Sequence, residues 1–148
     1  MSPMCVRLLE DDIASIREAA ARNLAELTSI FGSDWAMTHL IPSIKKILKD
    51  PSYLRRLTAV KACASVATVM EPDEATRNVL PIIIDMAKDE VPNIRFNVAK
   101  ALSAVGSTCR PTTLEAQIIP TLKTLIEDYD RDVQFFARQA RDSLNVQI

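Results

Sequence analysis

Apolar residues recur along the chain with the spacing of amphipathic helices. The clearest stripe places apolar side chains at relative positions 0, 1, 4, 7 and 8, in Leu40, Ile41, Ile44, Ile47 and Leu48. This period of about 3.6 residues predicts an α-helix with one buried face and differs from the period of two that marks a strand. Two equivalent stripes follow: Val79, Leu80, Ile83, Met86 and Ala87, then Ile118, Ile119, Leu122, Leu125 and Ile126.

A second helical segment follows each of these stripes. After a turn over residues 89–93, residues 94–105 are predicted to form a helix, for which Gly106 offers a stop, as Gly32 does earlier. Small residues recur on the contact face of the second helix in the different units, at Ala20, Ala59 and Ala137 and again at Ala62, Ala101 and Ala140. Small side chains let helices approach to about 8 Å. Each unit is therefore predicted to be a helical hairpin that stacks on the next one.

Four aspartates define the length of the unit, because Asp11, Asp50, Asp89 and Asp128 follow one another at a constant interval of 39 residues. A proline recurs at the same interval eight residues before each aspartate, at Pro3, Pro42, Pro81 and Pro120. An arginine recurs six residues after each of the first three, at Arg17, Arg56 and Arg95, and Gln134 takes its place in the fourth unit. Repetition at such a period is typical of a solenoid, because one hairpin cannot bury its own apolar face. We predict an all-α fold, an α-solenoid (superhelix) of four units, at about residues 1–32, 33–71, 72–110 and 111–148.

The periodic residues are predicted to shape the stack. A proline within a helix lacks an N–H group, so it must lie in the first turn or kink the helix. The aspartate precedes the second helix, where a carboxylate can accept hydrogen bonds from unpaired N–H groups. The arginine lies in the first turn, an unfavourable place for a cation, so we hypothesise a ladder in which each arginine pairs with an aspartate of its own or the adjacent unit. Carboxylates spaced evenly along a rod do not converge on a substrate, which argues against an active site.

Composition makes several function classes improbable. Charged residues nearly cancel, to a net charge of -1, which gives no nucleic-acid-binding footprint. Apolar runs fall short of the roughly 18 residues of a membrane span, and the start lacks the features of a signal peptide, so a cytoplasmic or nuclear location is expected. Cys5, Cys63 and Cys109 show no Cys-x-x-Cys spacing, so we expect small core residues and neither a disulfide framework nor a zinc site. No cofactor is expected.

The two ends of the chain differ in polarity. Near the C-terminus one helix face turns polar, because Arg138, Arg141, Asp142 and Asn145 stand where the preceding unit has Ala99, Leu102, Ser103 and Gly106. A polar outer face is typical of a terminal capping unit. Residues 3–9 instead start on an apolar stripe with no polar cap. We expect the chain to be the C-terminal part of a longer array, with an uncapped N-terminal end that favours self-association.

The repeated features resemble those of the HEAT repeat: an aspartate before the turn, a hydrophobic–arginine pair such as Ile16-Arg17 or Ile94-Arg95, and a proline in the first helix. Four strings are more specifically similar to the scaffold (A) subunits of protein phosphatase 2A: residues 14–20, 31–36, 50–54 and 93–100, in the order of that family's last four repeats. The resemblance implies a non-catalytic scaffold whose turns hold the phosphatase catalytic subunit. Regulatory B subunits would bind only indirectly, through missing N-terminal repeats.

The candidate binding residues lie on the turns within the hairpins. The resemblance implies contacts at Tyr53, Arg56, Val91, Asn93 and Asp130, Arg131 and Asp132, whereas Ala14 stands where that family usually has an aromatic residue. Successive turns line up along one edge of a solenoid, which independently predicts an interrupted apolar ridge of Ile13, Tyr53, Leu54, Val91 and Pro92. Exposed tyrosine and arginine are typical anchors of an interface. Phe135 and Phe136 are predicted to be core residues, and Trp35 to cap the connection between units.

Two other function classes are weighed against this scaffold. An importin-like adaptor would bind peptide or cargo through the concave helices, with a basic patch formed by Lys45, Lys46, Lys49, Arg55, Arg56 and Lys61, unless those side chains are simply a solvated face. An enzyme is favoured least. The one histidine, His39, has neither a partner nucleophile nor metal-ligand spacing and is predicted to be structural.

Overall fold

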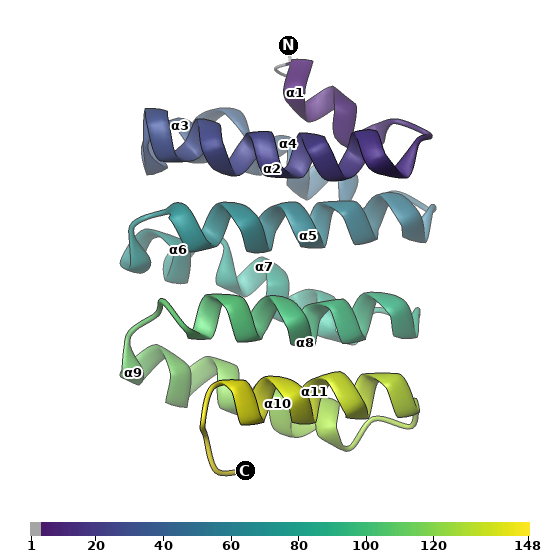
Figure 1. Ribbon diagram of the computed structural model, residues 1–148, viewed down its shortest axis with the longest axis vertical. Helices are drawn as coiled ribbons and strands as arrows, with labels where there is room; N and C mark the ends of the chain where they lie inside the picture. Colours follow the sequence, from purple (N-terminus) through teal and green to yellow (C-terminus); the bar gives the residue numbers. More distant parts are fainter. Residues whose placement is uncertain (1–3) are drawn as a thin grey trace.

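The computed structural model describes residues 4–148 as a stack of four helical hairpins (Figure 1). The second helix of each hairpin is unbroken: α2 (Ala14–Phe31), α5 (Tyr53–Val69), α8 (Pro92–Gly106) and α11 (Arg131–Ser143). The first helix is made of shorter pieces, namely α1 (Met4–Arg7) with η1 (Leu8–Glu10), α3 (Ser33–His39) with α4 (Ile41–Ile47), α6 (Pro72–Asn78) with α7 (Leu80–Asp85) and η2 (Met86–Lys88), and α9 (Pro111–Thr113) with η3 (Leu114–Ile118) and α10 (Ile119–Ile126).

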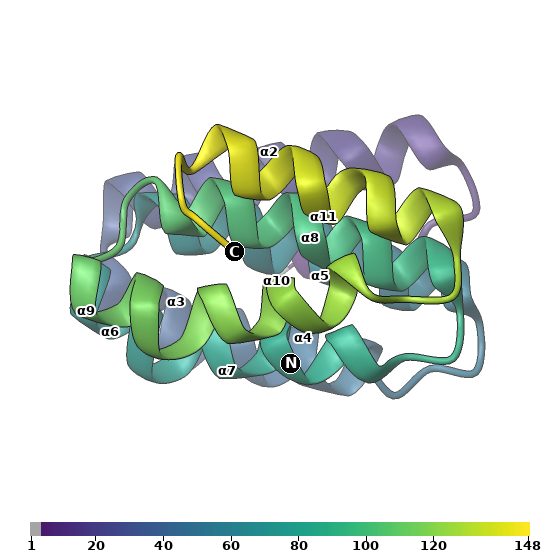
Figure 2. The same ribbon diagram turned by 90° about the horizontal axis from the view of Figure 1, so that it is seen from below.

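The helices form two layers. Figure 1 shows α2, α5, α8 and α11 side by side in the nearer layer, with the first helices behind them. Seen along the stack, α2 and α11 stand further out than α5 and α8, so this second-helix layer has a concave outer face (Figure 2). The predicted α-solenoid is confirmed.

The predicted apolar stripes form the core between the layers. Leu40, Ile41 and Ile44 are almost completely buried, and so are their counterparts Val79, Leu80, Ile83, Ile118 and Leu122. The recurring alanines are buried as well, from Ala20 and Ala59 to Ala137 and Ala140. Full burial of one leucine or isoleucine side chain stabilises the fold by about 1.5–3 kcal/mol, so the buried stripes make a large contribution to its stability.

Proline breaks the first helix, as predicted. The helix is interrupted at Leu40 and at Val79, and Pro42 and Pro81 each follow as the second residue of the next helical piece. In the fourth unit, residues 111–126 stay helical, but the π-helical segment η3 comes just before Pro120. Because proline cannot donate to the carbonyl one turn back, the helix must either break or change its register there. The first proline of the series, Pro3, lies outside the described residues.

The two glycines end helices for different reasons. Gly32 has φ +91°, a conformation that suits glycine, and it terminates α2 as predicted. Gly106 is the last residue of α8 and lies in close contact with a neighbouring side chain: a Cβ atom there would lie 2.8 Å from Leu144 Cδ2, so a larger residue would require the Leu144 side chain to move. The preceding turn is also shorter than predicted, because α8 begins at Pro92 and not at Ile94. Proline fits the first helical position, where its missing N–H costs nothing.

The polar face predicted for the last helix lies on the surface. Arg138, Asp142 and Asn145 are exposed, whereas Ala99 and Leu102 in the preceding unit are buried under α11. Within residues 4–148, no helix combines the length and the apolar character that a membrane span requires.

Candidate functional site

The turns within the hairpins lie along one edge of the stack, opposite the connections between units (Figure 1). We call this row of turns, at residues 11–14, 50–54, 89–93 and 128–132, the turn edge. Each turn is closed in the same way, because the periodic aspartate accepts a hydrogen bond from the N–H group two residues later. The donors Ile13, Ser52, Val91 and Asp130 lie 2.8–2.9 Å from the oxygens of Asp11, Asp50, Asp89 and Asp128. Each donor is the N-cap residue, so the aspartate serves the helix start as predicted.

Two arginines join adjacent turns in the predicted ladder. Arg56 donates from Nε and Nη2 to the carboxylate of Asp89, at 3.0 and 3.2 Å. Arg95 donates in the same way to Asp128, at 2.8 and 3.0 Å. In both cases Nη1 donates to two carbonyl oxygens of the arginine's own turn. Each pair is therefore a nearly buried rung between two units, and these contacts offset the poor placement of a cation at a helix start.

The rung at Asp128 also changes the ionisation of its members. Burial raises the pKa of the Asp128 carboxyl, but the hydrogen bonds from Arg95 and from the Asp130 N–H group outweigh burial, so the pKa lies below its ordinary value. The hydrogen bond to Asp128 raises the pKa of Arg95, against the effect of burial. Both groups therefore stay charged, and the turns they join are held by a bidentate ion pair.

The first interface lacks such a rung. Arg17 donates from Nη1 to the carbonyl oxygens of Asp11 and Asp12, at 2.8 and 3.1 Å, but within residues 4–148 its guanidinium meets no carboxylate. Asp50, its expected partner, is paired with Arg55 at 3.3 Å. In the fourth unit, Gln134 Nε2 donates to the Asp128 carbonyl and so keeps the contact to its own turn without a charge. The predicted ladder is thus confirmed at two interfaces and wrong at the first.

The predicted binding residues on the turn edge differ in exposure. Ile13, Tyr53 and Leu54 have exposed fractions of 56, 41 and 45%. Ala14, Arg131 and Asp132 are exposed too, whereas Val91, Pro92 and Asn93 are half-buried. Asp130 is half-buried and caps α11 by accepting from the N–H groups of Asp132 and Val133. The side chain of Arg56 is only 12% exposed, since its guanidinium is held in the rung.

The sequence only partly predicts which aromatic side chains of the last hairpin are exposed. Tyr129 was not singled out, yet it is 81% exposed on the turn edge, with the guanidinium carbon of Arg95 4.9 Å from its ring centroid. Its position directly after the periodic Asp128 was the available signal. The prediction that Phe135 is a core residue is wrong, because the side chain is 58% exposed on the outer side of α11. Phe136 packs against the core as predicted and stacks on Phe96.

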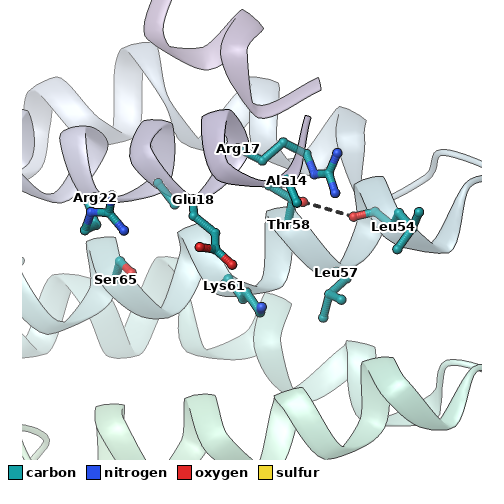
Figure 3. Close-up of a pocket in the computed structure, with 10 residues that line it drawn as sticks. Ala14, Arg17, Glu18, Arg22, Leu54, Leu57, Thr58, Lys61 and Ser65 are labelled. Carbon is teal, nitrogen blue, oxygen red and sulfur yellow. Dashed lines mark hydrogen bonds between the residues drawn. The ribbon is translucent and has the colours of Figure 1, made fainter. Parts of the chain in front are cut away.

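A groove lies on the concave face between α2 and α5. It encloses about 430 Å³, and Figure 3 shows its lining residues from both helices: Ala14, Arg17, Glu18, Ala21, Arg22, Leu54, Leu57, Thr58, Lys61 and Ser65. In Figure 3, Glu18 and Lys61 point toward the same part of the groove, with Arg17 and Arg22 on either side of them. Ala14 and Leu54 belong to the turn edge as well, so the groove opens beside it.

The basic patch considered for an adaptor is not assembled. Lys45, Lys46 and Lys49 lie in or just after α4, in the first-helix layer, whereas Lys61 lies on α5 and lines the groove on the concave face. Arg55 pairs with Asp50, and Arg56 pairs with Asp89. These cations shared a short stretch of sequence, but the turn between α4 and α5 sends them to opposite sides of the hairpin.

Other chemistry-bearing residues have packing roles. Trp35 lies at the connection from α2 to α3, 5.2 Å from Phe31 and 5.7 Å from His39 between ring centroids, so it covers that connection as predicted. Cys63 is buried, which raises the pKa of its thiol to about 12, and Cys5 and Cys109 pack against the core. In the part of the chain that the structure describes, no group of three or more potential ligands could hold a metal ion.

Sequence profiles identify the family of this chain, and solved structures support its fold. A sequence profile of HEAT repeats matches residues 41–140, and a second HEAT repeat profile matches residues 1–31. No significantly similar sequence was found among curated proteins. Similar solved structures include an engineered protein from a structural-genomics consortium (TM-score 0.59, 21% identity) and a designed armadillo repeat protein in complex with the peptide (KR)4 (TM-score 0.60, 19% identity). Each match covers 95% of this chain but only 60% and 63% of the other protein, and likeness at this identity supports the fold alone.

Proposed function

The chain belongs to the HEAT repeat family, and from this premise we propose that it is a non-catalytic scaffold that binds a protein partner along its turn edge. The partner we propose is the catalytic subunit of a type 2A serine/threonine protein phosphatase. Regulatory subunits would join this assembly only indirectly. The scaffold would then position the catalytic subunit within a larger assembly.

One observation carries the proposal: the turn edge presents exposed aromatic and aliphatic side chains on a backbone that is internally braced. Tyr53, Leu54 and Ile13 are exposed there, and Tyr129 extends the row to the fourth turn. The aspartate in every turn closes a hydrogen bond, and two rungs lock the later turns to one another. A pre-organised surface binds with a smaller entropic cost. The sequence strings at residues 14–20, 31–36, 50–54 and 93–100 support the choice of partner.

The test is binding of a purified type 2A phosphatase catalytic subunit to the immobilised chain, measured for wild type and Tyr53→Ala. We expect wild type to bind and Tyr53→Ala to weaken binding by about thirtyfold, because truncating an interface anchor costs on the order of 2 kcal/mol. Phe31→Ala is the matched control, since Phe31 is another exposed aromatic residue but is the last residue of α2, at the end of that helix away from its turn. No binding by wild type, or equal loss in both variants, would contradict the proposal.

A further inference from the structure

Arg17 lines the end of the groove that lies beside the turn edge, and Figure 3 shows its unpaired guanidinium directed away from Glu18 and Lys61, toward Leu54. Its Nη1 group is held by two carbonyl oxygens, in the same way as Nη1 of Arg56 and Arg95. In those two arginines, Nε and Nη2 grip a carboxylate from the next unit. For Arg17 the described residues supply no such carboxylate, and the side chain lines the groove. Nε and Nη2 of Arg17 are therefore two free donors on an anchored guanidinium, and the equivalent donors of Arg56 and Arg95 each bind a carboxylate.

The rest of the groove fits an apolar segment. Ala14, Ala21, Leu54 and Leu57 provide its apolar lining, and Leu54 is 45% exposed. Its charged lining is predominantly positive, with Arg17, Arg22 and Lys61 against the single carboxylate of Glu18. Arg22, Lys61 and Glu18 are exposed, and Glu18 lies on the side of Lys61 in Figure 3, so the two arginines remain available to a ligand.

We infer that this groove binds a segment of a partner protein in which aspartate or glutamate is flanked by leucine-sized side chains. The carboxylate would accept from Nε and Nη2 of Arg17, as Asp89 and Asp128 do from their arginines, and the apolar side chains would cover Leu54 and Leu57. Charge-assisted bidentate contacts are among the strongest hydrogen bonds in proteins. The inference stands on the groove alone and holds whichever protein binds the turn edge.

The test uses a fluorescein-labelled peptide, Gly-Ser-Leu-Asp-Glu-Leu-Leu-Ser-Gly, and fluorescence anisotropy with the whole chain. We expect saturable binding that weakens by about tenfold when asparagine and glutamine replace the two acidic residues, and by a similar factor in Arg17→Gln. Gln134 shows that glutamine at this repeat position still donates to the turn carbonyl, so Arg17→Gln removes the charge while keeping the fold. Arg138→Gln, an equal loss of charge on exposed α11, should bind the peptide as wild type does.

Three results would overturn the inference: no binding of the acidic peptide, equal binding of the neutral peptide, or an unchanged affinity in Arg17→Gln. Amide chemical-shift changes should fall on the seam at Ala21 and Ser65, and changes confined to the turn edge would overturn it too. Tyr53→Ala separates this site from the proposed function, because Tyr53 does not line the groove. That variant should bind the phosphatase subunit about thirtyfold more weakly and keep its affinity for the peptide within about twofold of wild type.

Discussion

The seam between α8 and α11 contains Phe96 and Phe136, stacked with their ring centroids 5.0 Å apart. At the equivalent positions two repeats earlier, the seam between α2 and α5 has Glu18 and Thr58. The same backbone arrangement therefore holds two aromatic rings in one seam and forms an apolar groove with a charged rim in the other. A smaller hollow at the later seam lies further along, beside Lys100 and Gln139.

The two seams also differ at the turn edge. Arg95 pairs with Asp128 across the third interface, whereas Arg17, two repeats earlier, meets no acidic partner among the residues described. The guanidinium of Arg95 thus stabilises the third interface, whereas the guanidinium of Arg17 at the first interface stays accessible. A repeat can thus keep its architecture while an individual position changes from stabilising the stack to leaving a charged group accessible.

Breaking the rung between Arg95 and Asp128 should destabilise the fold more than any other single change considered. Arg95→Ala leaves Asp128 mostly buried without its cation and removes the donor to two turn carbonyls, so we expect the free energy of unfolding to fall by about 3 kcal/mol. Urea denaturation followed by circular dichroism measures this change. Arg138→Ala is the control and should alter stability by less than about 0.5 kcal/mol. Similar values for both variants would show that the rung contributes no special stability.

Emptying the later seam should cost somewhat less. Phe136→Ala removes a half-buried ring that stacks on Phe96 and packs under Lys100, whose Nζ lies 4.2 Å from its centroid. We expect a loss of about 2 kcal/mol, below the range for completely buried phenylalanines. Phe135→Ala, at an exposed neighbour on the same helix, should cost less than about 1 kcal/mol in the same unfolding measurement. The reverse order of these two losses would mean that the stacked pair does not hold the seam.

Aromatic rings placed in the seam between α2 and α5 should fill its groove, as Phe96 and Phe136 fill the seam between α8 and α11. The double variant Glu18→Phe/Thr58→Phe places aromatic rings where α8 and α11 have theirs, and we expect it to gain about 1 kcal/mol from ring contact. The gain should exceed the sum of the single variants in a double-mutant cycle, because only the pair can stack. The same variant should stop binding the acidic peptide. Additive single effects would show that the seams differ in backbone as well as in side chains.

Acid should weaken the later interface through Asp128. Because the pKa of this carboxyl is lower in the folded chain than its ordinary value of 3.8, its ion pair stabilises the fold above about pH 4. That contribution is lost as the pH falls through the folded pKa, where Asp128 takes up a proton. The difference in stability between wild type and Asp128→Asn should therefore be constant from about pH 6 to pH 5 and shrink below about pH 4. A difference that grows on acidification would contradict the assignment of the lowered pKa to this pair.

Local sequence patterns were sufficient to predict the fold. The helical stripes at Leu40, Ile44 and Ile47 gave the buried faces, and the constant spacing of the aspartates gave the repeat that stacks them. The proline positions gave the breaks at Leu40 and Val79. These features depend on spacing within one unit, which is why they could be read from the chain. The start of α8 was misplaced because Pro92 is compatible with both a turn and a first helical residue.

The candidate site depended on relations between units, and there the sequence was less informative. Asp50 could pair with Arg17 of the preceding unit or with Arg55 of its own unit. Nothing in the repeat indicates that it pairs with Arg55 and leaves Arg17 unpaired. The groove exists because Glu18 and Thr58 lie opposite one another on different helices, 40 residues apart in sequence. The exposure of Phe135 likewise depends on α11 having no further helix packed on its outer side within the described chain.

Replacing Arg17 should change stability least and tests directly whether its guanidinium is unpaired. Arg17→Gln should change the free energy of unfolding by less than about 0.5 kcal/mol, because no carboxylate loses a partner and glutamine can keep the turn contact that Gln134 makes. Arg56→Gln, the same substitution one repeat later, breaks a bidentate pair with Asp89 and should cost several times more. Equal losses would mean that Arg17 pairs with Asp50 in solution. Asp50→Asn then decides the matter: if Arg17 is already unpaired, the Arg17→Gln change should be equally small in that background, because the two residues are not coupled.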